Sequence, residues 1–314
     1  MDLKELIRTA SQEQGFHAIG VAAASPLHDH GAHLERWIAR RLHGGLGYME
    51  RWRDVRVDPS HRGMVEGARS VVSLAMSYGS SAAGDSSLAS HIAMYARGPD
   101  YHGVLRERLG HLLDLVRREA PGVAGRAVVD TAPLLERAWA ARAGLGWIGR
   151  NTCLLNRELG SLFVLGELVL SVELEPDDPC EADGCGECRA CVEACPTSAL
   201  AAPDGHVLDV RRCLSYWTIE AKADLPPDVD GTDSFFGCDA CQLSCPYNAS
   251  LPPRSTPLAP LDRWREVSLE QVAQMADSSL KRLIEGTALG RAGAGKLRAA
   301  ARRVIRGQSR HRDR

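Results

Sequence analysis

The spacing of the cysteines constrains this chain more than any other feature. Ten cysteines occur in 314 residues, and none of them precedes Cys153. Four form the run Cys185-x-x-Cys188-x-x-Cys191-x-x-x-Cys195-Pro196, the spacing with which bacterial ferredoxins bind iron–sulfur clusters. In that arrangement three thiolates surround one cubane, and the fourth, before the proline, ligates a different cluster. The run therefore predicts a segment that is held together by inorganic clusters, because it contains few long apolar stretches.

A second run, Cys238-x-x-Cys241-x-x-x-Cys245-Pro246, repeats this ending but lacks one member, for which Cys213 is the candidate. Crossed ligation then predicts two [4Fe-4S] clusters. The first would be bound by Cys185, Cys188, Cys191 and Cys245, and the second by Cys195, Cys213, Cys238 and Cys241. Zinc is the alternative, because thiolates bind it too, but a zinc ribbon needs neither Cys-Pro ending. Cys153 and Cys180 are left over, as a buried strand residue and a loop thiol.

The composition is that of a globular protein with about two domains, since 44% of the residues are apolar and 25% are charged. The first residues, MDLKELIRT, are charged and contain no apolar region of a signal peptide. The most apolar stretch, 161–174, is too short to cross a bilayer and is interrupted by Glu167 and Glu173. We therefore expect a cytoplasmic protein that has reduced thiols and is not bound to a membrane.

Helical and strand patterns alternate through residues 1–175, which predicts an α/β or α+β domain. The individual expectations are strands over 69–77, 91–96 and 126–130, a helix over 103–120 and a helix from Pro133 to Ala143. Pro176 to Pro179 marks a boundary, after which 176–253 is the ferredoxin-like domain with both clusters. Residues 254–314 return to helical spacing and form a short helical C-terminus with a basic tail. That tail, 291–314, carries nine Lys or Arg against one acid, so it is either a contact for a polyanion or a solvated helix end.

Some common cofactor motifs are absent or misleading. Gly144-Leu-Gly-Trp-Ile-Gly149 matches the dinucleotide fingerprint, but a helix precedes it and a strand follows, which is the reverse of what that motif requires. The chain has no P-loop, HExxH or GxSxG motif. It also lacks the Asp-x-His-x-x-Gly loop that gives many cobalamin enzymes an axial histidine, although Asp100-Tyr-His-Gly103 comes near it.

Several segments nevertheless occur together in a characteristic order. They are Pro59, 67–72, Tyr95-Ala-Arg-Gly-Pro-Asp-Tyr-His102, Asp130-Thr-Ala-Pro133, Glu136-Arg137, 143–152, the first cysteine run, Cys213-Leu-Ser-Tyr-Trp-Thr-Ile-Glu220 and Gly237-Cys-Asp-Ala-Cys-Gln242. This order resembles that of the tRNA epoxyqueuosine reductase family, continuously over about residues 1–250 and more weakly to 305.

The resemblance implies a cobalamin enzyme that reduces epoxyqueuosine to queuosine at the wobble position of tRNA anticodons. Its N-terminal domain would bind base-off cobalamin without an axial histidine, in agreement with the missing loop. Electrons would come from a flavodoxin- or ferredoxin-type donor through the two clusters. The partner would be a tRNA anticodon stem-loop carrying epoxyqueuosine, and the enzyme is expected to be a monomer.

The resemblance also implies roles for individual residues. Asp130 would donate the proton that the departing epoxide oxygen needs. The structural alternative is that Asp130 or Thr131 caps the following helix. Corrin or substrate contacts are expected at Arg56, Tyr101, His102, Asp130, Asn151, Thr152 and Ser215. Lys222 is the candidate contact for a tRNA phosphate, or else an ordinary surface lysine.

Two other functions compete with this interpretation. A related cobalamin and iron–sulfur reductase of a small molecule such as an organohalide would contain the same cofactors, but that class usually bears an export signal. A simple electron carrier would contain the clusters but would need no large upstream domain and no corrin. Cobalamin content therefore separates the carrier from the two reductases.

Overall fold

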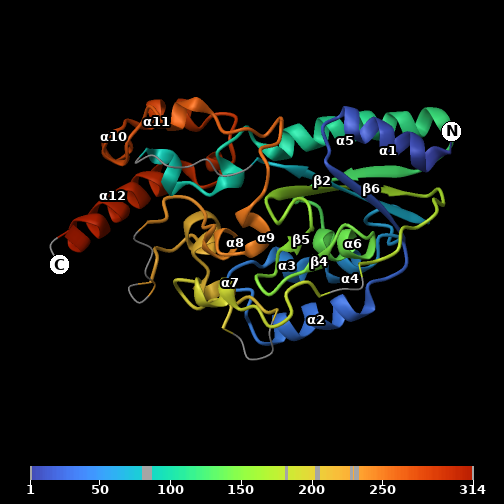
Figure 1. The fold of residues 1–314 in the computed structure, drawn as a ribbon, viewed down its shortest axis with the longest axis horizontal. Helices are drawn as coiled ribbons and strands as arrows, with labels where there is room; N and C mark the ends of the chain where they lie inside the picture. The colour runs from blue at the N-terminus through green and yellow to red at the C-terminus, as the bar shows by residue number, and fades with distance from the viewer. Residues whose placement is uncertain are drawn as a thin grey trace.

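A sheet of four antiparallel strands, in the order β1-β2-β6-β3, forms the centre of the N-terminal half of the computed structural model (Figure 1). The strands are β1 (Ala18–Ala23), β2 (Ser70–Ser77), β3 (Gly125–Val128) and β6 (Phe163–Leu170). The register places Val21 opposite Val72 and Leu74 opposite Gly166. The structure describes residues 2–79, 87–180, 183–201, 206–226, 229 and 233–312, with side chains as far as residue 309.

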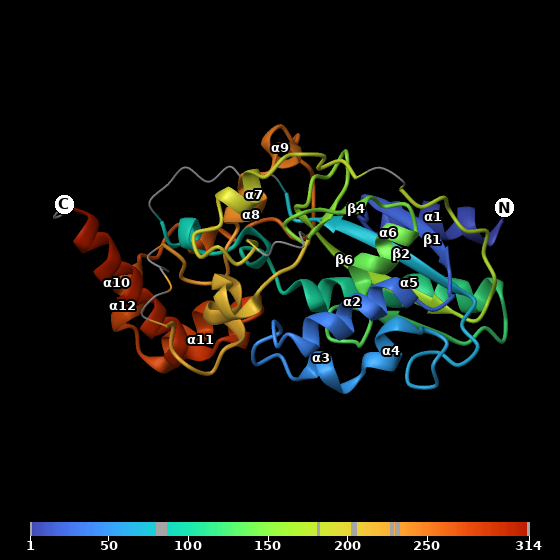
Figure 2. The same cartoon turned by 90° about the horizontal axis from the view of Figure 1, so that it is seen from below.

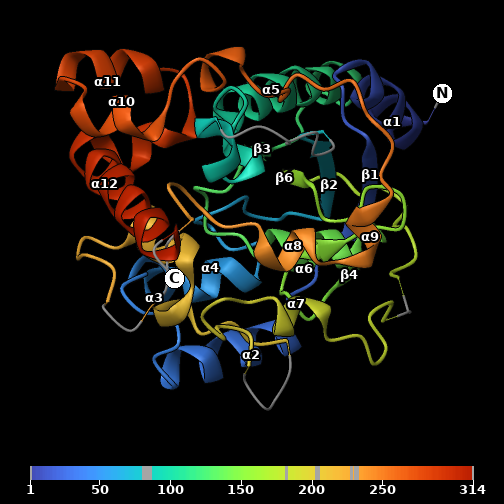
Figure 3. The same cartoon turned by 60° about the vertical axis from the view of Figure 1, so that its left-hand side comes forward.

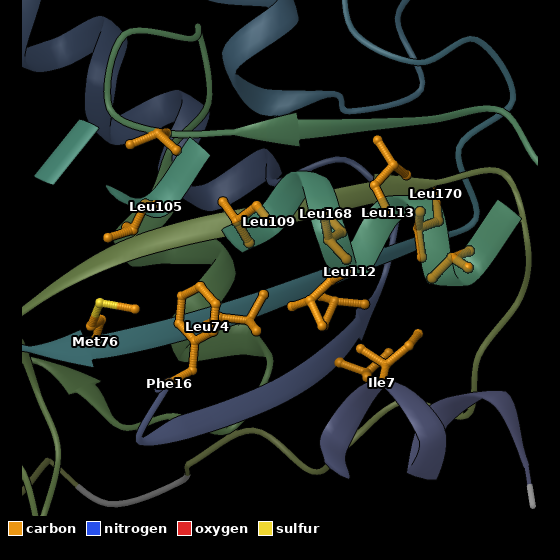
Figure 4. Close-up of a cluster of buried hydrophobic side chains, with 14 of the residues drawn as sticks. Ile7, Phe16, Leu74, Met76, Leu105, Leu109, Leu112, Leu113, Leu168 and Leu170 are labelled. Carbon is orange, nitrogen blue, oxygen red and sulfur yellow. The ribbon is translucent and has the colours of Figure 1, made fainter. Parts of the chain in front are cut away.

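Helices cover both faces of this sheet, so its central strand β2 is buried along its whole length. That is why its sequence, SVVSLAMS, is apolar or small at every position instead of alternating. Helices α1 (Leu3–Glu13) and α5 (Tyr101–Glu119) pack on one face through Ile7, Leu109 and Leu112 (Figure 4). Helix α6 (Glu136–Arg142) packs on the other face through residues that include Trp139.

Three short helices and a small second sheet flank α6. Helices α2 (His28–Ala39), α3 (Tyr48–Arg51) and α4 (Arg53–Val57) lie on this side of the molecule, as Figure 2 shows. Strands β4 (Trp147–Ile148) and β5 (Leu154–Leu155) form the second sheet. This arrangement brings the loop after β3 close to the α3–α4 segment.

A separate hydrophobic core lies at the other end of the molecule. It joins residues near Leu88 and Ile92 to Phe235 and Phe236 and to the C-terminal helices. Those helices are α10 (Leu269–Gln274), α11 (Asp277–Ile284) and α12 (Gly293–Arg312), visible together in Figure 3. The Trp264 indole donates a hydrogen bond to the Arg97 carbonyl at 2.6 Å. The C-terminal segment is therefore packed against residues that precede α5.

In the cysteine-rich region, the helical segments among the described residues are all short. These are α7 (Ala190–Glu193), α8 (Ala240–Leu243), α9 (Pro246–Ala249), a 3-10 turn at Val210–Arg212 and a π-helical turn at Tyr216–Glu220. Each of the two Cys-Pro endings follows one of the short helices, α7 or α8. Tight turns of this kind bring cysteines that are close in sequence around a common point.

The predicted mixed α/β architecture with a helical C-terminus is confirmed, and the strand expected at 69–77 is β2. The strand expected at 91–96 is wrong: 3-10 turns occupy Leu88–His91 and Met94–Ala96, and Ile92 makes one isolated bridge to Phe236. The three domain boundaries remain a prediction. No helix in the described ranges is both long and apolar enough to span a bilayer.

Candidate active site

A cavity of about 440 Å³ lies where the loop after β3, the start of α5, the π-helical turn and the C-terminal segment meet. Its walls combine tyrosines with acids, a histidine and an arginine. The lining residues are Tyr48, Tyr95, Asp100, Tyr101, His102, Asp130, Ile219, Glu220, Thr287, Ala288, Gly290 and Arg291. A cavity with a few convergent polar groups of this kind is the usual form of an active site.

Asp130 projects into this cavity from the loop between β3 and α6. Its side chain is 41% exposed, and its backbone has a φ of +30°, which is uncommon for a residue other than glycine. Its Oδ2 atom lies 3.1 Å from Nε2 of His102 and 3.6 Å from the guanidinium of Arg291. Asp130 is therefore open to a ligand while two cationic groups hold one of its oxygens.

His102 lies between two carboxylates. Asp100, the N-cap of α5, accepts from the His102 backbone N–H at 3.1 Å and contacts Nδ1 of its ring at 2.7 Å. The other ring nitrogen faces Asp130, and the Tyr101 ring stacks on the imidazole with centroids 4.0 Å apart. The start of α5 thus fixes the orientation of the imidazole, so that both nitrogens can donate when it is protonated.

The electrostatics place the mobile proton on His102. The hydrogen bond to Asp130 raises the pKa of His102, burial opposes this, and the bond to Asp100 adds to the increase. Burial alone would raise the pKa of Asp130, but the hydrogen bond and charge of His102, together with the charge of Arg291, lower it. Both shifts favour an Asp130 carboxylate paired with a His102 imidazolium.

Arg291 closes the cavity from the C-terminal segment. It lies at the end of the 3-10 turn Ala288–Arg291, and its guanidinium contacts Glu220 at 2.9 Å as well as Asp130. These ion pairs connect three stretches of chain that are far apart in sequence. The cavity is therefore assembled from both ends of the molecule.

The first group of cysteine thiols surrounds a second, smaller cavity of about 260 Å³. Cys185, Cys188, Cys191 and Cys245 all line it, together with Asn151 and Tyr247. Burial, followed by the charges of Cys185 and Cys245, raises the pKa of the Cys191 thiol. The thiol from the second run therefore lies beside the three from the first run, as crossed ligation requires.

Four of the other six cysteines, Cys195, Cys213, Cys238 and Cys241, form another group, which is more deeply buried. Burial, and then the nearby thiolates Cys153, Cys238, Cys213 and Cys195, raises the pKa of Cys241. Cys213 thus lies within the group although it is distant in sequence from the two runs. The ten cysteines all lie within the described residues, and none of them forms a disulfide there.

The spare thiols lie close to the two groups. Cys153 adjoins Cys241, and Cys180 packs with Cys185 against the small core formed by Trp147, Leu155 and Cys245. Within the described ranges, no three His, Cys, Asp or Glu side chains converge on the position of a single metal ion. In the first group the thiols instead stand around a cavity of about 260 Å³, and thiolates are the ligands of iron–sulfur cubanes.

The sequence of this chain is similar to that of known proteins. Residues 56–131 match the family model described as epoxyqueuosine reductase QueG, DUF1730, and residues 184–248 match a 4Fe-4S double cluster binding domain. An epoxyqueuosine reductase of Leadbetterella byssophila is 40% identical over 278 residues, covering 86% of this chain and 90% of that one. The chain belongs to the epoxyqueuosine reductase family.

Solved structures of this family have the same fold. The epoxyqueuosine reductase of Streptococcus thermophilus matches with a TM-score of 0.85 at 28% identity, covering 98% of this chain and 82% of that one. A family structure that contains an epoxyqueuosine-modified tRNA-Tyr stem loop matches with a TM-score of 0.84 at 27% identity, covering 96% and 80%. The Bacillus subtilis enzyme, with a TM-score of 0.82 at 27% identity over 97% and 82%, was solved with its catalytic aspartate loop swung out of the active site.

The structure brings only some of the predicted site residues to the Asp130 cavity. Tyr101 and His102 line it, and buried Arg56 lies behind Tyr48, to whose carbonyl it donates at 3.0 Å. Neither Asp130 nor Thr131 caps α6, because this helix begins at Glu136 and its N-cap is Leu135.

The other predicted contacts lie nearer the cysteines. Asn151 donates to the Cys241 carbonyl at 3.4 Å and lines the first cysteine cavity. The Ser215 side chain hydrogen-bonds the Cys213 thiol. Thr152, with a φ of +62°, receives hydrogen bonds from Arg137, while Lys222 is exposed two residues beyond Glu220. Their predicted corrin and tRNA contacts remain predictions.

Most residues that line the cavity were not predicted from the sequence as site residues, among them Tyr48, Glu220 and Arg291. Glu220 ends a segment that resembles the family, so the motif itself could have indicated it. Arg291 lies in the basic C-terminal stretch, where nothing distinguishes it from the other arginines. Only the fold shows that it faces Asp130.

Proposed function

We propose that this chain reduces epoxyqueuosine to queuosine in the anticodon of tRNA. The observation that carries the proposal is the Asp100–His102–Asp130 arrangement at an open cavity backed by cysteine thiols. Family membership supports it, because relatives at 40% identity are epoxyqueuosine reductases. A tRNA substrate also places the enzyme in the cytoplasm.

The deeper group of cysteines lies directly behind the cavity. Gly237, which precedes Cys238, adopts a φ of +73°, and a Cβ placed on it would lie 3.7 Å from both Tyr95 and Ile219. Those two side chains line the cavity. We infer that Cys195, Cys213, Cys238 and Cys241 bind the [4Fe-4S] cluster nearer the reaction. Cys185, Cys188, Cys191 and Cys245, which include the exposed Cys188, then bind the cluster that meets the electron donor.

The residues around the cavity also suit cobalamin, whose corrin ring carries amide side chains. Arg56 is buried, and within the described chain its Nε has no hydrogen-bond partner. A buried donor of this kind normally has a partner, which a corrin amide would supply. Bound cobalamin would supply the reducing chemistry that opens the epoxide, in the base-off form that the family resemblance implies.

The protein's own residues would then transfer a proton to the epoxide oxygen. Conversion of an epoxide to an alkene consumes a pair of electrons and a pair of protons and releases the oxygen as water. As negative charge grows on that oxygen, Asp130 is the exposed group that can hand it a proton. Because Asp130 rests as a carboxylate, it must first take the proton held on His102 at Nε2. Asp100 keeps the imidazole in position during this transfer.

The remaining partners follow from the same proposal. A flavodoxin- or ferredoxin-type protein would deliver the electrons, and the enzyme would act as a monomer. Lys222, exposed beside the cavity wall, would contact a tRNA phosphate, as would the basic tail. The side chains of 310–314 in that tail lie outside the described residues.

Mass spectrometry of tRNA nucleosides tests the function directly. A strain that lacks this gene should accumulate epoxyqueuosine and lose queuosine, and the wild-type gene should restore it. Normal queuosine in the deletion strain would refute the proposal. Dehalogenation of an organohalide by the purified holoenzyme would favour the small-molecule reductase, and a protein without cobalamin would favour the electron carrier.

A further inference from the structure

Glu167 is a buried acid that the proposed reaction does not use. It lies in the middle of β6, opposite Ser73 of β2 and Val128 of β3, and it is 0% exposed. Among the described residues, neither its carboxyl oxygens nor the Ser73 hydroxyl has a hydrogen-bond partner. Burial, and then the charge of Glu136, raises the pKa of Glu167 well above its usual range. Glu167 is therefore a neutral acid inside the sheet.

Glu136 connects this buried acid to the loop that carries Asp130. It is the first residue of α6, which packs on the same face of the sheet. Its Oε1 atom accepts the backbone N–H of Asp130 at 2.5 Å. Because a positive φ costs free energy for a residue with a side chain, this hydrogen bond holds Asp130 in a conformation that the loop would otherwise leave.

We propose that Glu136 is a positioning residue whose hydrogen bond to the Asp130 backbone holds the Asp130 loop in the active site, and we call this contact the latch. Glu167 beneath it stays neutral, so Glu136 is the ionisable one of these two acids. The inference rests on the proposed function, because the latch matters through the presentation of Asp130. The swung-out loop of the Bacillus subtilis relative shows that such a loop has an alternative position in that protein.

The latch depends on pH because an ionised carboxylate is the stronger acceptor. Burial and the charge of Asp130 raise the pKa of Glu136 to about 8. As the pH rises through this value, Glu136 loses its proton and holds the Asp130 N–H more tightly. The titratable and charged groups that act on Glu136 or are coupled to it are Asp130 in the loop, Arg137 on α6, Tyr101 and His102 on α5, Arg56 on α4 and Glu167 on β6.

Hydrogen exchange at the Asp130 amide tests the latch without using catalysis. Peptides covering residues 129–135 of the holoenzyme would be followed by mass spectrometry, with rates corrected for the intrinsic effect of pH. In the wild type, protection should rise as the pH passes through about 8. Glu136→Gln should remove this pH dependence and lower protection at alkaline pH roughly tenfold, and Glu136→Ala should lower it up to about a hundredfold.

Glu107→Gln is the matched control, because Glu107 is exposed on α5 and should leave the profile unchanged. Cluster absorbance shows that each variant is folded. Steady-state assays above about pH 8 should give Glu136→Gln a lower kcat with an unchanged KM for the tRNA stem-loop. A flat wild-type profile, the same profile in Glu136→Gln, or an effect on KM alone would overturn the latch. A holoenzyme that shows the pH-dependent protection but does not reduce epoxyqueuosine would instead refute the proposed function.

Discussion

At the scale of single residues, the site separates the group that delivers a proton from the group that stores it. Asp130 faces the cavity but rests as a carboxylate, whereas His102 is held between two acids and carries the proton. A single carboxyl group exposed to a charged neighbour such as Arg291 would be a poor acid by itself. Pairing it with His102 supplies the missing proton at neutral pH.

The first prediction concerns Asp130→Asn. This change keeps the shape of the side chain but removes its ability to relay a proton, so the single-turnover rate of epoxyqueuosine reduction should fall by about 10²- to 10⁴-fold. Iron content should be unchanged, because Asp130 belongs to neither cysteine group. Reduction at the wild-type rate by a fully loaded variant would exclude Asp130 as the proton donor.

The second prediction concerns pH. Because His102 has a raised pKa, it is protonated below that value, and the wild-type rate should decline on the alkaline side as His102 loses its proton. His102→Gln should be slower at neutral pH and should lack this decline. Single-turnover rates between about pH 6 and pH 9 measure both profiles. An identical alkaline decline in His102→Gln would assign the titration to another group.

The sequence motifs identified Asp130, Tyr101 and His102 because these residues lie within short segments of a characteristic order. Arg291 could not be predicted in this way. Its role comes from ion pairs to Asp130 and Glu220, which are distant in sequence, and a local pattern contains no information about such contacts. The same holds for the hydrogen bond between Glu136 and the Asp130 backbone.

At the scale of secondary-structure elements, the central sheet contains one acid in otherwise apolar surroundings. Glu167 on β6 faces the side covered by α6, where Val71, Ala75 and Val169 also lie. A neutral acid adds no charge to this core, but it makes the stability of the sheet depend on pH.

The third prediction follows from that acid. The pKa of Glu167 in the folded state lies well above its unfolded value. Its contribution to the free energy of unfolding is therefore fully present below about pH 4.3 and is lost as the pH rises towards the folded pKa. Within that window the loss is about 1.4 kcal/mol per pH unit. Glu167→Gln removes it, so the melting temperature of the variant should exceed that of the wild type by a margin that grows with pH. Glu107→Gln is the control, and a margin independent of pH would contradict the interpretation.

Helices and strands could be predicted from the sequence where the periodicity of apolar residues matches their burial in the fold. The apolar run at β2 and the amphipathic pattern of α5 both correspond to real elements. The segment 91–96 is apolar for another reason, because its residues pack against Phe236 and the C-terminal helices without forming a strand ladder. Pro133 suggested a helix start, yet α6 begins only at Glu136, after the loop has placed Asp130 in the cavity.

At the scale of the whole molecule, Cys245 of the second run lies beside three cysteines of the first, and we propose that the two runs exchange ligands. The fourth prediction tests this exchange by iron analysis. Cys245→Ser should remove one cluster and about half of the iron, and adding Cys185→Ser should cause little further loss because both thiols serve the same cluster. Combining Cys245→Ser with Cys238→Ser should instead remove nearly all the iron.

Cys180→Ser is the matched control, since Cys180 packs near the first group but is not assigned as a ligand. Little further loss on adding Cys238→Ser, with nearly complete loss on adding Cys185→Ser, would show that the ligands are not crossed. The crossed pairing and the place of Cys213 in the second group were both predicted from the spacing of the cysteines. The structure places Cys213 near Cys241, but the ligand assignment remains a prediction.

Arg291 is synthesised after every other residue that lines the cavity. The ribosome synthesises the whole sheet, the Asp100, His102 and Asp130 residues and every proposed cluster ligand before it adds Arg291. The nascent chain can therefore fold its sheet while one wall of the reaction cavity is still unmade. A polypeptide released at that stage would contain the thiols and the acid but would leave the acid uncovered. Completion of the site thus follows the synthesis of every other residue that lines the cavity.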